Sequence, residues 1–304
     1  MGRPGAGFAE LGRAALGNTT EGIYSRLEKR DRRRVFGRSF PIGTTWLTTN
    51  PMTDAPAATS TAATQKPAPV DHGPSDPWGA CLTPMVVFLG LGLIEPSREG
   101  KGLAATLGIT YDLYPVLYAI RVAVTLLLVW RAWPSIRAWL GKASWWPPIL
   151  GILLVVPWVW LSVLQRDGKW ISGDTGRVGF DPVEFYGADK DSLWAYLLLR
   201  GLGLIVVVPI VEELFLRGFL LRFVIRESFW YVPFGAVTGS VLATCALYAV
   251  GSHPAEAVAA VVWFFAVTWV CWKTRQPIDA ITVHAATNLA LGAYVLATGA
   301  WWLL

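Results

Sequence analysis

Seven apolar segments, each close to the length of a membrane-spanning helix, constrain the fold of this chain more than any other feature. They cover approximately residues 77–95, 112–132, 146–165, 193–216, 233–252, 255–273 and 277–300. A helix of about 20 apolar residues crosses the hydrocarbon core of a bilayer and satisfies its own backbone hydrogen bonds there. The sequence therefore predicts an all-α fold, a polytopic transmembrane helix bundle with about seven spans.

Composition and the placement of aromatic residues support this fold class. The 304 residues are 54% hydrophobic and only 15% charged, and they include 17 Trp. Trp and Tyr gather where apolar segments end, for example at Trp145 and Trp146, as in the aromatic belts of membrane proteins. The three cysteines, Cys81, Cys245 and Cys271, lie far apart without metal-ligand spacing. We predict that they are small core residues.

The first 76 residues contain no sustained apolar period and are predicted to be a disordered, basic and low-complexity tail, followed by a transmembrane domain over 77–304. Residues 1–40 hold nine Lys/Arg and four Asp/Glu, which accounts for the net charge of +5. The basic run from Arg26 to Arg34 could indicate binding to nucleic acid, but no folded element accompanies this run. A solvated cytoplasmic tail without a nucleic-acid partner is the preferred interpretation. Met52 is a second possible translation start.

Positive charges in the loops predict the orientation. With the N-terminus in the cytoplasm, the inner loops hold Arg131, Arg137, Lys142, Arg222, Arg226, Lys273 and Arg275. The outer segment 166–192 holds six Asp/Glu against four Lys/Arg. This bias favours a cytoplasmic N-terminus in a multi-pass membrane protein. The Asp-Gly pairs of 166–192 do not match a calcium loop, so a solvated loop is predicted there.

Two adjacent carboxylates, Glu212 and Glu213, stand in the middle of the fourth apolar segment. Each costs roughly 2 to 3 kcal/mol on membrane-insertion scales. On a helix, Arg217 lies on the same face as Glu213 at i, i+4, whereas Glu212 points about 100° away. We therefore predict an ion pair between Glu213 and Arg217, and we expect Glu212 to be the carboxylate that can take or give a proton.

Two histidines fall in the apolar C-terminal third, while His72 lies in the predicted tail. His253 ends the fifth segment, and His284 shares one helical face with Asn288 at i, i+4 inside the seventh. A single buried His is usually a structural residue. Here, however, two Glu, one Arg, two His and one Asn gather in three neighbouring segments with few other polar groups, which favours a catalytic site.

These residues resemble two motifs of the CPBP intramembrane proteases, a family that contains the CAAX prenyl endopeptidases and the Abi proteins. Residues Glu212–Arg217 match EExxxR, and His284–Asn288 match HxxxN. The resemblance covers about residues 190–300 and is strongest to bacterial CAAX-protease-related proteins that accompany exosortase systems. The family also has an FxxxH motif, from which this chain departs. Four residues after Tyr248 stands Ser252, so that His253 comes one position late.

The resemblance implies a role for each matched residue. Glu212 would activate water as general base with help from His253, and Glu213 would pair with Arg217. His284 and Asn288 would position or stabilise the developing oxyanion. The implied activity is endopeptidase cleavage of a membrane-associated protein, either a prenylated CAAX-type protein or a sorted one, near its C-terminus. Membrane lipids and a protein or peptide substrate are the expected partners, and the sequence leaves the oligomeric state open.

Metal dependence stays open at this stage. Glu212, His253 and His284 could supply ligands for Zn²⁺ with one open position. The chain lacks HExxH, however, and the resemblance points mainly to a glutamate-dependent mechanism. A further difficulty is geometric. If the fifth segment runs as a straight helix to Gly251, His253 lies at its outer end and Glu212 nearer the inner end, unless Pro209 kinks the fourth span or residues 218–234 re-enter the membrane.

Three other functions compete with the endopeptidase. A non-catalytic membrane immunity or partner protein could retain this fold, and the displaced His253 favours it. A transporter could use intramembrane carboxylates as a proton relay, but no inverted repeat is visible. Serine chemistry of the rhomboid type fits poorly. Arg121 and Arg200 could line a cavity but are expected to snorkel towards the membrane surface. Gly201 and Gly203 are expected to permit close helix packing.

Overall fold

The computed structural model describes residues 72–168 and 179–304. The chain divides into two units, Met1–Gln65 and Lys66–Leu304, and all the described residues belong to the second. The predictions for residues 1–71 and for 169–178 of the outer loop lie outside the described residues.

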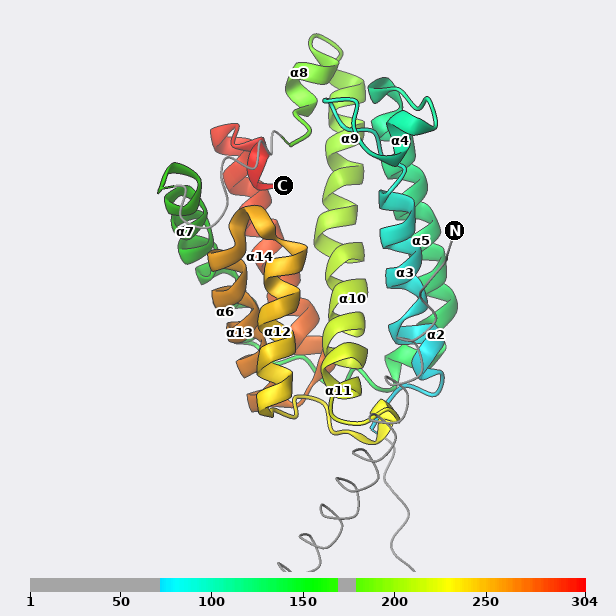
Figure 1. Cartoon of the computed structure of the whole chain (residues 1–304), viewed down its shortest axis with the longest axis vertical. Helices are drawn as coiled ribbons and strands as arrows, with labels where there is room; N and C mark the ends of the chain where they lie inside the picture. Colours follow the sequence, from blue (N-terminus) through cyan, green and yellow to red (C-terminus); the bar gives the residue numbers. More distant parts are fainter. Residues whose placement is uncertain (1–71, 169–178) are drawn as a thin grey trace, which may run out of the picture. The chain divides into compact units, whose positions relative to one another are not determined.

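The described part of the chain is all helical, as predicted, and contains no strand (Figure 1). Its α-helices are α2 (Pro77–Cys81), α3 (Thr83–Gly92), α4 (Leu103–Thr106), α5 (Tyr114–Arg137), α6 (Pro147–Leu153), α7 (Val155–Gly168), α8 (Pro182–Tyr186), α9 (Lys190–Leu202), α10 (Val208–Glu213), α11 (Leu221–Phe223), α12 (Gly239–Ser252), α13 (Ala257–Thr274) and α14 (Pro277–Thr298). Short 3₁₀ helices cover Tyr111–Leu113, Phe229–Tyr231, Pro254–Glu256 and Trp301–Leu303. Two π-helical segments cover Gly203–Val207 and Leu214–Leu220.

Each of the seven apolar segments forms helix, but their lengths differ. Among the described residues, five helical stretches are long and apolar enough to cross a membrane: Tyr111–Arg137, Pro147–Gly168, Lys190–Phe223, Pro254–Thr274 and Pro277–Thr298. The two remaining apolar stretches, Pro77–Gly92 and Gly239–Ser252, are shorter. The protein is therefore an integral membrane protein built as a helix bundle.

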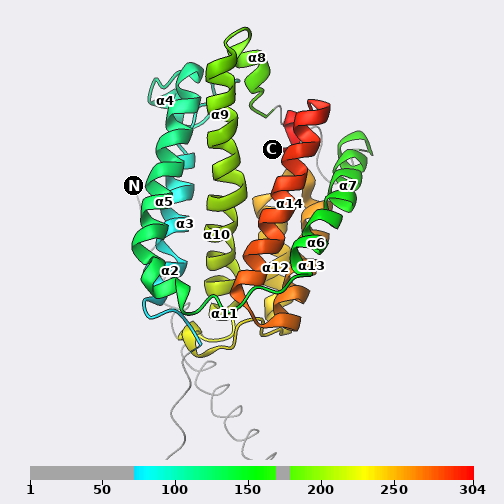
Figure 2. The same ribbon diagram turned by 180° about the vertical axis from the view of Figure 1, so that it is seen from behind.

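The fourth span is one continuous helical stretch of 34 residues from Lys190 to Phe223. It lies between a group that contains α3 and α5 and a group that contains α12, α13 and α14 (Figures 1 and 2). Both π-helical segments interrupt it, one just before Pro209 and one just after Glu213. A π turn re-aims the side chains that follow it and is common at functional sites.

The fifth span differs from the prediction in where it begins. Helix α12 starts at Gly239 rather than at Pro233, and Thr238 caps it by accepting a hydrogen bond from the Val241 N–H. Its 14 residues span about 21 Å, which is less than the roughly 30 Å of a hydrocarbon core. His253, the residue that ends α12, therefore does not reach the far side of the bundle, and the expected geometric difficulty does not arise.

The segment before α2 is attached to the bundle rather than part of a tail. The His72 carbonyl accepts hydrogen bonds from the Trp139 indole and the Arg222 guanidinium, and its N–H donates to the Trp230 carbonyl. The Asp76 side chain caps α2. Residues 72–76 were predicted to be disordered, and this boundary was wrong because polar backbone contacts can hold a segment that has no apolar period.

The core is packed around α13 and α14. All three cysteines are buried and unpaired by disulfides, as predicted. Helix α6 crosses α14 at Gly151, whose carbonyl accepts a hydrogen bond from the Thr287 hydroxyl at 2.9 Å. A Cβ on Gly151 would lie 2.3 Å from the Val283 carbonyl oxygen of α14. Only glycine allows this approach, as is common where membrane helices meet.

Replacing Gly151 with Ala is expected to lower the free energy of unfolding by about 1 to 3 kcal/mol, because the added methyl group must push two helix backbones apart. Thermal unfolding in detergent, followed by Trp fluorescence, measures the effect. Gly90→Ala in α3 is the control, since its Cβ would meet nothing within 4 Å. Equal stability of the two variants would contradict the packing argument.

Candidate active site

A cavity of about 340 Å³ lies where the fourth span faces α14 and the junction of α12 and α13. Four of the six predicted site residues line it: Glu212, His253, His284 and Asn288. The other two, Glu213 and Arg217, are buried beside it and connect to it through His284. The six residues that the sequence singled out therefore gather around one space.

Glu213 is the centre of a buried polar network. Its Oε1 accepts a hydrogen bond from Arg217 Nη1 at 2.7 Å, which confirms the predicted i, i+4 pair. The same oxygen lies 3.0 Å from Nδ1 of His284. Because an ionised carboxylate can only accept, Nδ1 carries the proton in this contact and the His284 ring is fixed in orientation. The Arg217 guanidinium also donates to the Phe264 carbonyl of α13.

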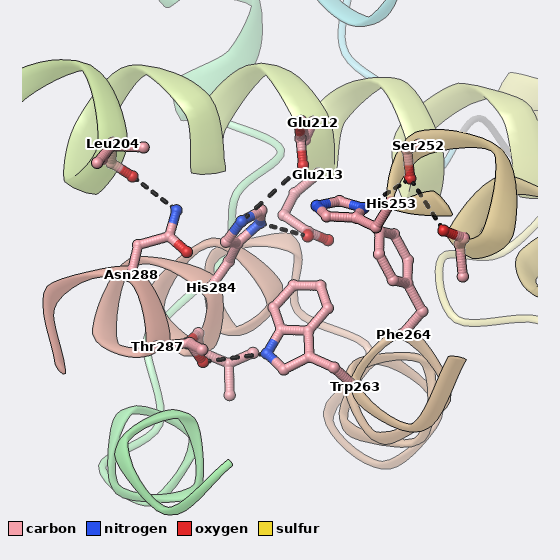
Figure 3. A network of polar contacts seen from close by, with 12 residues as sticks. Leu204, Glu212, Glu213, Ser252, His253, Trp263, Phe264, His284, Thr287 and Asn288 are labelled. Carbon is pink, nitrogen blue, oxygen red and sulfur yellow. Dashed lines mark hydrogen bonds and ion pairs between the residues drawn. The ribbon is translucent and has the colours of Figure 1, made fainter. Parts of the chain in front are cut away.

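Glu212 faces the cavity and is not the partner of Arg217, as expected. Its Oε2 lies 3.9 Å from Nε2 of His284, and its side chain is 17% exposed (Figure 3). This separation is too long for a direct hydrogen bond and is one at which a water molecule can bridge two polar groups. The two adjacent carboxylates thus face opposite nitrogens of a single imidazole, and Glu213 alone is at hydrogen-bond distance.

His253 reaches the cavity although it is displaced by one residue from the family motif. Its Nδ1 lies 2.8 Å from the Ser252 hydroxyl, and its ring packs edge-on against Trp158 at 5.5 Å between centroids. The Ser252 hydroxyl in turn donates to the Tyr248 carbonyl. Ser252, which occupies the expected motif position, therefore orients the histidine that follows it (Figure 3).

Asn288 has a structural contact that the sequence did not predict. Its Nδ2 donates to the Leu204 carbonyl at 2.8 Å (Figure 3). In the preceding π turn, the Val208 N–H bonds to the Gly203 carbonyl. In the same register the Leu204 carbonyl would need an N–H from Pro209, which has none. Asn288 supplies the missing donor, and its second amide hydrogen remains for the cavity.

Substituting Asn288 with Ala is expected to lower stability by about 1 kcal/mol, since the Leu204 carbonyl loses its donor. Pro209→Ala restores an N–H at the position that the π turn requires. The double variant should therefore be less destabilised than the sum of the two single variants predicts. Denaturation in detergent of the four proteins tests this, and strict additivity would contradict the assignment.

The scaffold of the site comes from α13, which the sequence analysis did not include. The Trp263 ring packs edge-on against His284 at 4.7 Å between centroids, and its indole N–H donates to the Thr287 hydroxyl. The Arg217 guanidinium lies 4.9 Å from the centroid of the Phe264 ring. Two aromatic residues in a run of apolar letters carry no polar signal, so only contact across the bundle identifies them.

Two arginines were expected to snorkel, and that expectation was wrong. Arg121 and Arg200 both line the cavity. Arg121 forms an ion pair with Glu95 at 2.9 Å and stacks over the Phe88 ring at 4.1 Å. Of the two glycines expected at close helix contacts, Gly203 has one, because a Cβ there would lie 2.0 Å from the Tyr118 hydroxyl.

The side chains do not form a metal centre as they stand. Glu212, His253 and His284 share the cavity, yet in residues 72–168 and 179–304 no three His, Cys, Asp or Glu side chains are grouped to hold an ion. Nδ1 of His284 is already engaged by Glu213.

One comparison with known proteins found a match. Residues 194–290 match the family model described as type II CAAX prenyl endopeptidase Rce1-like. No curated protein and no solved structure was found to match the chain. The match includes both EExxxR and HxxxN and confirms the family resemblance, while the narrower likeness to exosortase-associated proteins stays a prediction. Residues 194–290 of this integral membrane protein are therefore similar to the Rce1-like type II CAAX prenyl endopeptidases.

Proposed function

We propose that the protein is an intramembrane endopeptidase that hydrolyses a membrane-associated protein near its C-terminus, with Glu212 as the base that activates water. One observation carries this proposal. Glu212 faces the cavity 3.9 Å from His284, while Arg217 is bonded to Glu213 instead. A carboxylate placed in this way can take a proton from a water molecule that it shares with an imidazole.

In this mechanism Glu212 removes a proton as the water oxygen attacks the carbonyl carbon of the scissile bond. The carbonyl π electrons move onto the oxygen and form a tetrahedral oxyanion. When the oxyanion collapses, the C–N bond breaks, and the leaving amine takes the proton that Glu212 accepted. His253, held by Ser252, lies on the same cavity and assists the orientation of the water.

The oxyanion needs donors. The second amide hydrogen of Asn288 is one, and preorganised donors of this kind are worth about 3 kcal/mol in other hydrolases. His284 carries its proton on Nδ1 towards Glu213, so Nε2 donates to the oxyanion only when the imidazole is also protonated there.

We further propose that the N-terminal side of the bundle faces the cytoplasm of a bacterial cell. The C-terminal ends of α5, α11 and α13 lie at the same end of the bundle as the start of α2 (Figure 1). The basic residues that follow these helices therefore gather at one end, as the positive-inside rule requires of the cytoplasmic side.

A comparison of C-terminal peptides by mass spectrometry tests the function. Membranes of cells that produce the wild-type protein are compared with membranes of cells that produce Glu212→Ala, with exposed Arg166→Ala as the matched control. The proposal expects peptides that are shortened in the wild type and the control but intact in Glu212→Ala. The second candidate function, a non-catalytic partner protein, expects identical peptide sets, and the displaced His253 is the feature that favours it.

A further inference from the structure

Arg200 is a cation on the wall of the cavity that forms no close ion pair with a carboxylate in the described part of the chain; Glu95, the nearest acidic influence, is paired with Arg121. Its Nη1 donates to the Tyr114 hydroxyl at 3.2 Å, and its guanidinium lies 4.8 Å from the centroid of the Tyr118 ring. Both partners are neutral. A guanidinium binds a carboxylate through two parallel N–H groups. In Arg200 no acidic side chain of the described residues occupies both of these groups.

The other two arginines around the cavity differ in this respect. Arg121 is paired with Glu95 and Arg217 with Glu213. An ionised side chain within a membrane-spanning helix is expensive, and it normally faces a partner or a functional cavity. For Arg200 the cavity itself is the place where an anionic partner would bind.

Arg200 and Glu212 stand at the two ends of one row of residues on the fourth span. Arg200, Leu204, Val208 and Glu212 follow at intervals of four residues, and all four line the cavity. One face of the fourth span therefore forms a continuous wall. Twelve residues of helix correspond to about 18 Å between the ends of this wall. Its middle is apolar.

We infer that Arg200 binds the C-terminal carboxylate of the peptide substrate while Glu212 acts on the scissile bond. This inference rests on the proposed function. A C-a-a-X terminus has two aliphatic residues before its last residue, and these would lie against Leu204 and Val208. The three residues released by cleavage span about 10 Å when extended. The Arg200 and Glu212 side chains and the attacking water occupy the remaining distance.

Binding of matched peptides tests the inference independently of turnover. The probes are N-acetyl, S-farnesyl Cys-Val-Leu-Ser as the free acid and the same peptide as the C-terminal carboxamide. Their dissociation constants are measured in detergent with purified proteins that all carry Glu212→Gln, so that the acid is not cleaved during the measurement. The acid is expected to bind about 10- to 100-fold more tightly than the amide. In Arg200→Gln this difference should vanish through weaker binding of the acid, and in Arg200→Lys it should be intermediate because the charge is kept and the fork is lost.

Arg166→Gln, which alters an exposed arginine outside the cavity, is the control and should keep the full difference. Equal affinity for acid and amide when Arg200 is intact, or a difference that survives Arg200→Gln, would overturn the inference. If Arg200→Gln does not fold, the Arg200→Lys variant and the ratio measured with Arg200 intact still decide it. Cleavage of the free acid by the wild type is scored separately, so failure of the proposed function is distinguishable from failure of this subsite.

Discussion

Glu212→Gln is expected to lower the rate of peptide-bond hydrolysis by about 10²- to 10⁴-fold, the usual contribution of a general base. The amide has nearly the same shape as the carboxylate but cannot accept a proton from water. Glu212 has no direct hydrogen bond to His284, since their closest polar atoms are 3.9 Å apart. The substitution should therefore leave the unfolding temperature nearly unchanged, and kcat of the purified protein on a farnesylated peptide measures the loss.

Two controls make this result interpretable. Glu212→Asp keeps the base but withdraws it by one methylene group, so it should retain more activity than Glu212→Gln. A chelator such as 1,10-phenanthroline, added to the wild type, separates a glutamate-dependent reaction from a metal-dependent one. Full activity of Glu212→Gln would contradict the assignment of the base, and loss of activity with the chelator would require a metal site that the described side chains do not form.

Breaking the Glu213–Arg217 pair should have the largest effect on stability. Both side chains are at most 3% exposed, and the pair is closed at 2.7 Å. Removal of one partner from a buried ion pair leaves a charge without compensation and costs about 3 to 5 kcal/mol. Arg217→Met is therefore expected to lower the unfolding temperature strongly or to prevent accumulation of the folded protein, as measured by Trp fluorescence and by yield in the membrane.

A double-mutant cycle identifies the pair as the cause. Glu213→Gln together with Arg217→Met removes both charges, so the double variant should be more stable than Arg217→Met alone. Glu213→Gln also weakens the contact with Nδ1 of His284, and activity should stay low even where stability returns. Independent, additive losses of stability would show that the two charges do not depend on each other.

Local spacing explains which parts of the site could be predicted. The Glu213–Arg217 pair and the common face of His284 and Asn288 follow from the helical repeat alone. The contact between Glu213 and His284 joins residues 71 positions apart, and only the packing of α14 against the fourth span brings them together. The length of the apolar segments likewise predicted the seven helical stretches. It did not show that two of them, Pro77–Gly92 and Gly239–Ser252, are shorter than a membrane span.

Other features escaped prediction because they depend on backbone detail. Pro209 was considered as the cause of a kink in the fourth span. In the structure it leaves the Leu204 carbonyl without a backbone N–H donor, and the Asn288 amide donates to that carbonyl instead. Sequence spacing left open whether His253 replaces the motif histidine or the site is impaired, and it could not show that α12 ends beside the cavity, which His253 lines. Arg200 was expected at the membrane surface because arginines near helix ends usually extend towards it. Its place on the cavity wall follows from the packing of the helices around it, which the sequence does not show.

The 14-residue length of α12 has a consequence for the surrounding lipid. A helix this short cannot match an average bilayer, so acyl chains beside it must compress or splay, and headgroups sink towards the middle of the membrane. Such a local dip brings bulk solvent closer to the buried cavity that Glu212 lines. Chain length of the lipids is thus expected to tune turnover, with thinner bilayers imposing the smaller deformation.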